Sequence, residues 1–160
     1  NAYHSYSRFV FDAGGLKYPL SNFPDMSILT PHEGEFRMLF NIPKKIPISY
    51  SLLLKVQKLI GSKIIILKSF NTFIITNIKI YIIENSPSVL ATAGTGDVLS
   101  GILISLLSQG YSRLETSILG TYLHAEAANY YMNNFSKDGM NATKLINCIP
   151  YAYNKIRLDG

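Results

Sequence analysis

The sequence predicts an α/β fold with a mainly parallel sheet flanked by helices. Three short, continuous apolar runs rich in β-branched residues occur in the first half of the chain, and such runs are typical of strands buried on both faces. Stretches with apolar residues at helical spacing lie between these runs, and the last third of the chain is helical in pattern. This order of elements favours an α/β domain.

Each of the three predicted strands runs directly into a polar or charged residue. The strands and the residues that follow them are 8–11 before Asp12, 26–29 before Thr30-Pro31-His32, and 64–67 before Lys68. Ligands of parallel α/β sheets bind at the carboxyl ends of strands. We therefore expect these three strand ends to share one cleft.

Periodicity and end signals predict the remaining elements. The predicted helices are 33–40, 49–60, 97–109 and 112–133, followed by two short helices at 144–149 and 151–156. The runs 73–76 and 80–83 flank Thr76-Asn77, which indicates a hairpin, and residues 85–88 are expected to form a loop.

Composition sets limits on function. The chain has 160 residues, 48% of them hydrophobic and 16% charged, which fits one domain with its own core and excludes a disordered chain. The single cysteine, Cys148, excludes a disulfide framework and a Cys-rich zinc site. No apolar run approaches the roughly 18 residues of a membrane-spanning helix. The net charge of +5 comes from scattered basic residues, so we expect no nucleic acid as partner. A protein of a reducing compartment, the cytoplasm, with no membrane partner is the default expectation.

Residues 91–101 form the most informative segment, a glycine-rich turn that becomes a long apolar helix. Gly94 and Gly96 let backbone N–H groups point inward, and the helix N-terminus adds unpaired N–H groups and a positive dipole end. Asp97 at that N-terminus either stabilises the helix or takes a proton from a hydroxyl beside a bound phosphate. The spacing matches neither a P-loop nor the dinucleotide motif G-x-G-x-x-G.

These motifs resemble a known family. Gly94-Thr-Gly-Asp97 resembles the Gly-x-Gly-Asp anion-hole motif of the ribokinase-like superfamily, and residues 91–101 resemble the form found in ADP/ATP-dependent NAD(P)H-hydrate dehydratases. Further segments resemble that family in the same order: Phe11-Asp-Ala-Gly-Gly-Leu16, Thr30-Pro-His-Glu-Gly-Glu-Phe36, Leu67-Lys-Ser-Phe-Asn-Thr72, Tyr122 to Ala128, and Gly139 to Leu145.

The resemblance implies a ribokinase-like fold without its N-terminal strands. The family's domain begins with further strands and helices before the Asp-Ala segment, and nothing in this sequence corresponds to them. We therefore expect residues 1–160 to form a single, N-terminally incomplete domain. In that case the sheet has an exposed edge, part of the cleft wall is absent, and activity of this chain alone is in question.

The resemblance also implies roles for individual residues. His32 and Asp97 contact the hydrated nicotinamide, and Asp97 is the catalytic residue. The residues implied to bind the nucleotide are Lys68, Ser69, Phe70, Asn71, Thr72, Gly94, Thr95 and Gly96. Asp12 either holds substrate or a cation or simply ends its strand. For Glu35 we favour a structural role over a water-mediated contact with Mg²⁺, and we expect no other metal site. We expect His124 to pack in the core.

The implied reaction repairs a damaged cofactor. Hydrated NADH or NADPH, (6S)-NAD(P)HX, reacts with ADP, or with ATP, in the presence of Mg²⁺ and yields NAD(P)H, AMP and phosphate. The family implies a homo-oligomer and a functional link to an epimerase. Two alternatives stay open: a ribokinase-like kinase for a sugar or vitamin precursor, whose relatives carry Thr-Pro-Asn where this chain has Thr30-Pro31-His32, and a non-catalytic remnant that binds nucleotide.

Overall fold

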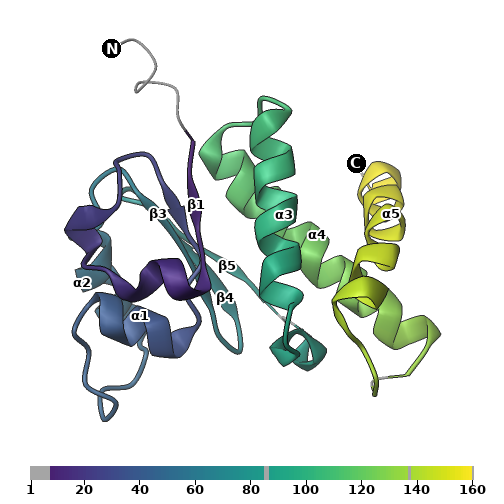
Figure 1. The fold of residues 1–160 in the computed structure, drawn as a ribbon, viewed down its shortest axis with the longest axis horizontal. Coiled ribbons are helices and arrows are strands. Elements are labelled where there is room, and N and C mark those ends of the chain that lie inside the picture. The colour runs from purple at the N-terminus through teal and green to yellow at the C-terminus, as the bar shows by residue number, and fades with distance from the viewer. Residues whose placement is uncertain (1–7, 85–86, 137, 160) are drawn as a thin grey trace.

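A sheet separates two groups of helices in the computed structural model, which describes residues 8–84, 87–136 and 138–159. In Figure 1, helices α1 (Glu33–Leu39) and α2 (Tyr50–Gln57) lie on one side of the sheet. Helices α3 (Thr95–Ser108) and α4 (Arg113–Asn134) lie on its other side, with α5 (Ala142–Asp159) farthest from it. The α/β class expected from the sequence is confirmed.

Five strands form one sheet in the order β1-β2-β3-β4-β5. They are β1 (Val10–Phe11), β2 (Ile28–Leu29), β3 (Ile64–Lys68), β4 (Thr72–Ile75) and β5 (Ile80–Ile83). Strands β1, β2 and β3 are parallel neighbours, whereas β3–β4 and β4–β5 pair antiparallel. The sheet is therefore mixed rather than mainly parallel, because short reversals join β3 to β4 and β4 to β5 where no crossover helix intervenes.

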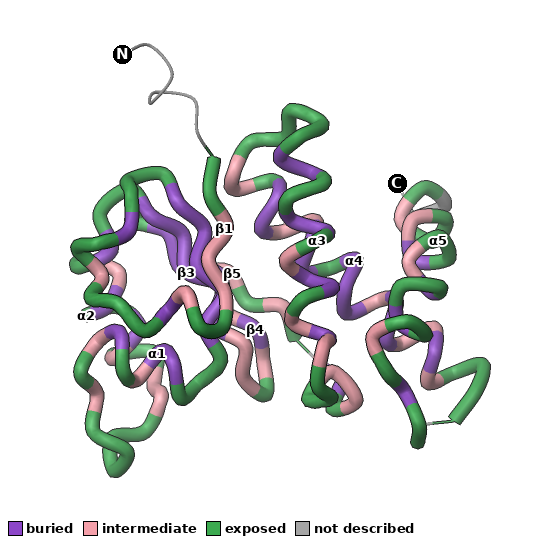
Figure 2. Tube along the Cα trace, in the orientation of Figure 1, coloured by how far each residue is buried: buried purple, intermediate pink, exposed green. Residues whose placement is uncertain are grey.

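Alternate side chains of the central strands point to opposite faces of the sheet. Ile65 and Leu67 of β3 pack with Phe36 of α1 and Leu53 of α2. Ile64 and Ile66 of β3 pack with Leu99 and Leu103 of α3, and the trace of β3 is coloured as buried in Figure 2. Both faces are covered, which explains why β2 and β3 are continuous apolar runs rather than alternating ones.

The helical half has a core of its own. Val98 and Ile102 of α3, Leu123 of α4, and Leu145 and Cys148 of α5 belong to one buried cluster. No helix within the described residues is both long and apolar enough to span a bilayer. In Figure 1, the N-terminus of α3 lies beside the carboxyl ends of the parallel strands.

Two predictions about local structure are corrected. The two short helices expected at 144–149 and 151–156 are one helix, α5, that continues through Pro150. Proline removes one intrahelical hydrogen bond, but Cys148 and Ala152 on either side of it remain buried against the cluster, which favours a continuous helix. In the predicted loop 85–88, Ser88 begins a 3₁₀ helix, η4 (Ser88–Ala91), while residues 85 and 86 lie outside the described part of the chain.

Candidate functional site

Three strand ends meet in one place, as the sequence predicts. Lys68 N donates to the carbonyl of Pro31 at 2.8 Å, and His32 forms a parallel bridge with Lys68. Asp12 directly follows β1, and its side chain reaches Lys68 across the intervening strand. The carboxyl ends of β1, β2 and β3 therefore form one edge that carries an acid, an imidazole and an amine.

Asp12 and Lys68 form the charged centre of this edge. Lys68 Nζ lies 2.9 Å from Asp12 Oδ1, and Ser100 Oγ donates to Asp12 Oδ2 at 3.1 Å. Burial by itself would raise the pKa of Asp12, but the hydrogen bond and the charge of Lys68 outweigh it and the pKa is lowered. Asp12 is therefore an anion that holds the ammonium group of Lys68 and links the strand end to α3.

The glycine turn lies against this ion pair. Gly94 is the N-cap of α3 and has a φ of 85°, a left-handed conformation that favours glycine. A Cβ placed on Gly96 would lie 3.2 Å from Lys68 Nζ and 3.3 Å from Asp12 Oδ2. The backbone of the turn can therefore lie this close to the ion pair because residue 96 has no side chain.

Two backbone donors at this turn are unpaired. In the first turn of α3, Thr95 N donates to Thr92 and Val98 N donates to Gly94. The N–H groups of Gly96 and Asp97 have no hydrogen-bond partner among the described residues. Unpaired N–H groups at the N-terminus of a 14-residue helix, beside a lysine, form an anion-binding site.

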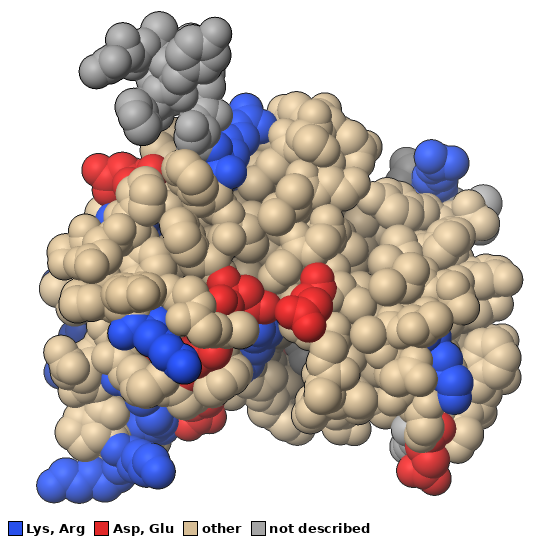
Figure 3. All heavy atoms as spheres, in the orientation of Figure 1, with Lys and Arg blue, Asp and Glu red and all other residues tan. Residues whose placement is uncertain are grey.

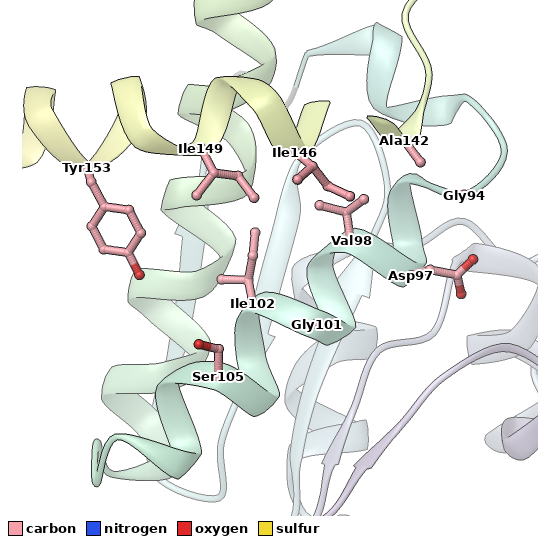
Figure 4. Close-up of a pocket in the computed structure, with 10 residues that line it drawn as sticks. All are labelled: Gly94, Asp97, Val98, Gly101, Ile102, Ser105, Ala142, Ile146, Ile149 and Tyr153. Carbon is pink, nitrogen blue, oxygen red and sulfur yellow. The ribbon is translucent and has the colours of Figure 1, made fainter. Parts of the chain in front are cut away.

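Asp97 is exposed at the mouth of this site. Figure 4 shows its carboxylate turned away from the apolar side chains of α3 and α5. Figure 3 shows acidic and basic side chains gathered at the centre of the same face, between the sheet and the helical half. The carboxylate is therefore open to a ligand, as a catalytic base requires.

Thr95 and His124 fix the backbone of the turn through hydrogen bonds inside the protein. Thr95 is buried, and its Oγ1 shares its one hydrogen between the carbonyls of Leu90 at 2.6 Å and Thr92 at 2.8 Å. The buried His124 places Nε2 2.8 Å from the carbonyl oxygen of Thr95. Thr95 is one of the residues expected to bind the nucleotide, but its hydroxyl, its N–H and its carbonyl all have partners within the protein.

His32 and Glu35 form the N-terminal cap of α1. His32 Nδ1 accepts from the N–H groups of Gly34 and Glu35, and Glu35 Oε2 accepts from the N–H of His32 at 2.9 Å. Because Nδ1 accepts, the neutral ring carries its proton on Nε2, and the His32 side chain is 61% exposed. His32 Nε2 lies 3.5 Å from Glu35 Oε1, so its N–H is exposed beside that carboxylate, and Glu35 takes the structural role that the sequence favoured.

The expected nucleotide loop is the reversal between β3 and β4. Lys68 and Thr72 are cross-strand partners, and Ser69, Phe70 and Asn71 connect them. Phe70 is 86% exposed, which is unusual for a phenylalanine and leaves its ring free to cover a planar ligand. The loop therefore emerges from the same strand end as the Lys68 ammonium group.

A cleft of about 450 Å³ begins at the glycine turn and runs between α3 and α5. Gly94 and Asp97 line its mouth, and Val98, Ile146 and Ile149 line its interior (Figure 4).

Within the described residues, no three side chains of His, Cys, Asp or Glu converge to hold a metal ion.

Sequence reasoning missed Ser100 and understated His124. Ser100 lies four residues after Gly96, which places both on the same face of α3, but no local signal places that face against Asp12, 88 residues away. His124 packs in the interior, as expected, but it also binds the carbonyl of Thr95. No pattern in the sequence of α4 indicates that hydrogen bond.

Comparison with known proteins agrees with this geometry. Residues 1–151 match the family model described as NAD(P)H-hydrate dehydratase. The chain is 34% identical over 139 residues to the bifunctional NAD(P)H-hydrate repair enzyme Nnr of Helicobacter pylori, covering 79% of this chain and 29% of that protein. It is 36% identical over 104 residues to the ADP-dependent (S)-NAD(P)H-hydrate dehydratase of Neisseria meningitidis, covering 64% of this chain and 35% of that protein.

Solved structures show the same fold. Bacillus subtilis YxkO, a member of the UPF0031 family, matches with a TM-score of 0.78 at 25% identity, over 91% of this chain and 56% of that one. The ADP/ATP-dependent NAD(P)H-hydrate dehydratase of the same organism, co-crystallised with ATP and Mg²⁺ and soaked with CoA, matches with a TM-score of 0.74 at 25% identity, over 91% and 55%. The chain thus spans about a third of the curated relatives and just over half of the solved ones, and it belongs to the NAD(P)H-hydrate dehydratase family.

Proposed function

We propose that this chain carries the phosphoryl-transfer centre of an ADP- or ATP-dependent NAD(P)H-hydrate dehydratase. The observation that carries the proposal is the pair of unpaired N–H groups at Gly96 and Asp97 beside the Lys68 ammonium group. Family membership of residues 1–151 supports the substrate, a reduced nicotinamide cofactor hydrated on its ring. We treat residues 1–160 as part of one ribokinase-like domain.

Asp97 would act as the general base. Its exposed carboxylate takes the proton from the ring hydroxyl of the hydrated cofactor while the hydroxyl oxygen attacks the terminal phosphorus of ADP. AMP leaves with the electron pair of the broken P–O bond. The N–H groups of Gly96 and Asp97 and the ammonium group of Lys68 stabilise the negative charge on the transferred group.

Dehydration then follows from the chemistry of the phosphorylated ring. Phosphate is a far better leaving group than hydroxide. It departs with the C–O electron pair as the ring nitrogen lone pair forms a C=N bond, and a proton leaves the adjacent carbon to restore NAD(P)H. The donor Nε2–H of His32 would orient the nicotinamide portion, and the loop from Lys68 to Thr72 would hold the nucleotide.

Mg²⁺ belongs to the proposal as an ion carried by the nucleotide. Magnesium is commonly held by phosphates and one or two carboxylates while it keeps several waters. The carboxylates of Asp12 and Glu35 have partners inside the protein, whereas that of Asp97 is exposed. Because Asp97 is assigned to the proton of the hydroxyl, such an ion would be held mainly by the phosphates and by water, and it would neutralise phosphate charge.

Assembly and location are further parts of the proposal. The bifunctional relatives support a functional link to an epimerase that acts on the same damaged cofactor. We place the reaction in the cytoplasm, where reduced nicotinamide cofactors are used, and we expect a homo-oligomer.

The deciding experiment is a turnover assay with hydrated NADH. We expect recovery of NADH absorbance that requires ADP or ATP and releases one phosphate per NADH formed. A stable phosphorylated product would point to a small-molecule kinase instead. Nucleotide binding without any turnover would overturn the proposal in favour of a non-catalytic role.

A further inference from the structure

His124 is a buried polar side chain that the reaction scheme above leaves without a task. It is 6% exposed within α4, and its Nε2 lies 2.8 Å from the carbonyl oxygen of Thr95. A carbonyl can only accept, so Nε2 carries the proton. Burial lowers the pKa of His124 to about 4, against the opposing effect of the Thr95 bond and helped by the charge of Lys68. The ring is therefore neutral at pH 7.

The carbonyl that His124 holds belongs to the same peptide unit as the N–H of Gly96. A trans peptide is planar, and its C=O and N–H point in opposite directions. The hydrogen bond from α4 therefore turns the Gly96 N–H away from His124. This is one of the two unpaired donors of the turn, and it sits on the residue that packs against Lys68.

The side chain of Thr95 fixes the same peptide from the other direction. Its hydroxyl shares one hydrogen between the carbonyls of Leu90 and Thr92, which lie at the end of η4. Thr95 is thus held through its side chain by η4 and through its carbonyl by α4. A donor that is fixed before the ligand arrives does not have to reorganise during phosphoryl transfer.

We propose that His124 is a positioning residue that directs the Gly96 N–H toward a phosphate oxygen of the bound nucleotide through the Thr95 peptide. The inference rests on the proposed function for the identity of the anion. It assigns His124 no contact with substrate: the ring acts on the direction of one backbone donor.

Three variants separate this role from simple packing. His124→Gln keeps an N–H at nearly the reach of Nε2, and His124→Leu keeps bulk but removes the donor. Leu123→Ala is the matched control, because Leu123 is buried in the neighbouring position of α4 and packs in the cluster of α3, α4 and α5. ADP affinity, kcat and KM for hydrated NADH, melting temperature and the ¹H–¹⁵N signal of Gly96 are measured for each.

We expect His124→Leu to bind ADP about 10-fold more weakly and to lose roughly 10- to 100-fold in kcat, with KM for hydrated NADH little changed. His124→Gln should recover most of both, and its Gly96 signal should stay near the wild-type position. Leu123→Ala should lose stability but keep ADP affinity. Equal ADP affinity in His124→Leu and Leu123→Ala, or no rescue by glutamine, would overturn the inference.

A measurement on the wild-type chain covers the case in which a variant does not fold. Long-range ¹H–¹⁵N spectra of the histidine rings should show His124 as the Nε2–H tautomer at pH 7, and finding the Nδ1–H tautomer would contradict the inference. If the wild type binds ADP but does not turn over hydrated NADH, the proposed function fails, while ADP affinity and the Gly96 signal still decide the role of His124.

Discussion

Asp12 holds Lys68 at 2.9 Å while the hydroxyl of Ser100 binds the other oxygen of the same carboxylate. One acid thereby connects the end of β1, the end of β3 and the first turns of α3. This contact sets the position of the ammonium group beside Gly96. In the absence of a bound phosphate, the Asp12 carboxylate balances the positive charge of Lys68 and keeps the ammonium group in position.

Replacing Asp12 with asparagine should destabilise the protein at neutral pH and change its acid response. The pKa of Asp12 is lowered below its usual 3.8 because Lys68 outweighs the effect of burial. The stabilisation is therefore present above the unfolded-state pKa and is lost as pH falls through the lower folded-state pKa. Urea unfolding of wild type and Asp12→Asn should differ at pH 7, and the difference should shrink as the pH falls below 3.8. A difference that stays constant over this range would rule out this ion pair as the cause.

Adding a methyl group at Gly96 should disturb function more than stability. A Cβ there would lie 3.2 Å from Lys68 Nζ, so Gly96→Ala displaces the ammonium group and should weaken ADP binding by about 10-fold. Gly101→Ala is the control in the same helix, because a Cβ there meets nothing within 4 Å. It should raise stability by about 0.5–1 kcal/mol and leave ADP affinity unchanged. Titration calorimetry tests both, and equal affinities in the two variants would argue against close approach at Gly96.

His32 combines a structural acceptor and an exposed donor, which substitution can separate. In His32→Asn the side-chain oxygen replaces Nδ1 as the cap of α1, so unfolding free energy should change by less than about 0.5 kcal/mol. The Nε2 donor is lost, and KM for hydrated NADH should rise. His32→Ala loses the cap as well and should cost about 1 kcal/mol. Chemical unfolding and steady-state kinetics measure the two effects, and an unchanged KM in His32→Asn would remove His32 from the substrate site.

The buried imidazole of His124 should make the protein acid-labile. Its pKa is about 4 in the folded chain, mainly because of burial, against 6.5 as the ordinary value. The unfolded state binds more protons between these values, so stability falls as pH drops from about 6.5 to 4, by up to about 3 kcal/mol. His124→Gln has no such titration, so its unfolding free energy should fall less over this interval. Parallel curves for the two proteins would contradict the neutral, buried state of His124.

The strand ends and the glycine turn were predictable because their signals are local. Short apolar runs ending at Asp12, His32 and Lys68 indicated the carboxyl edge of a sheet, and all three ends meet there. The helix expected over 112–133 is confirmed, and Ser112 with Glu115 forms the capping box at the start of α4. In each case a few neighbouring residues determine the local structure.

What escaped prediction depends on partners distant in sequence. The bond from Ser100 to Asp12 joins residues 88 positions apart, and that from His124 to Thr95 joins residues 29 apart. Two short helices were expected at 144–149 and 151–156, but burial of the apolar face of α5 favours one helix that continues through Pro150. Tertiary packing decided these features.

The most direct test of the account is ADP-dependent turnover of hydrated NADH by Asp97→Asn. The amide keeps the size of the side chain at the N-terminus of α3 but cannot take the proton of the ring hydroxyl. We predict normal folding, ADP affinity within a few-fold of wild type, and a fall in kcat of at least about 100-fold. An Asp97→Asn protein that keeps nearly full turnover would contradict the catalytic role of Asp97.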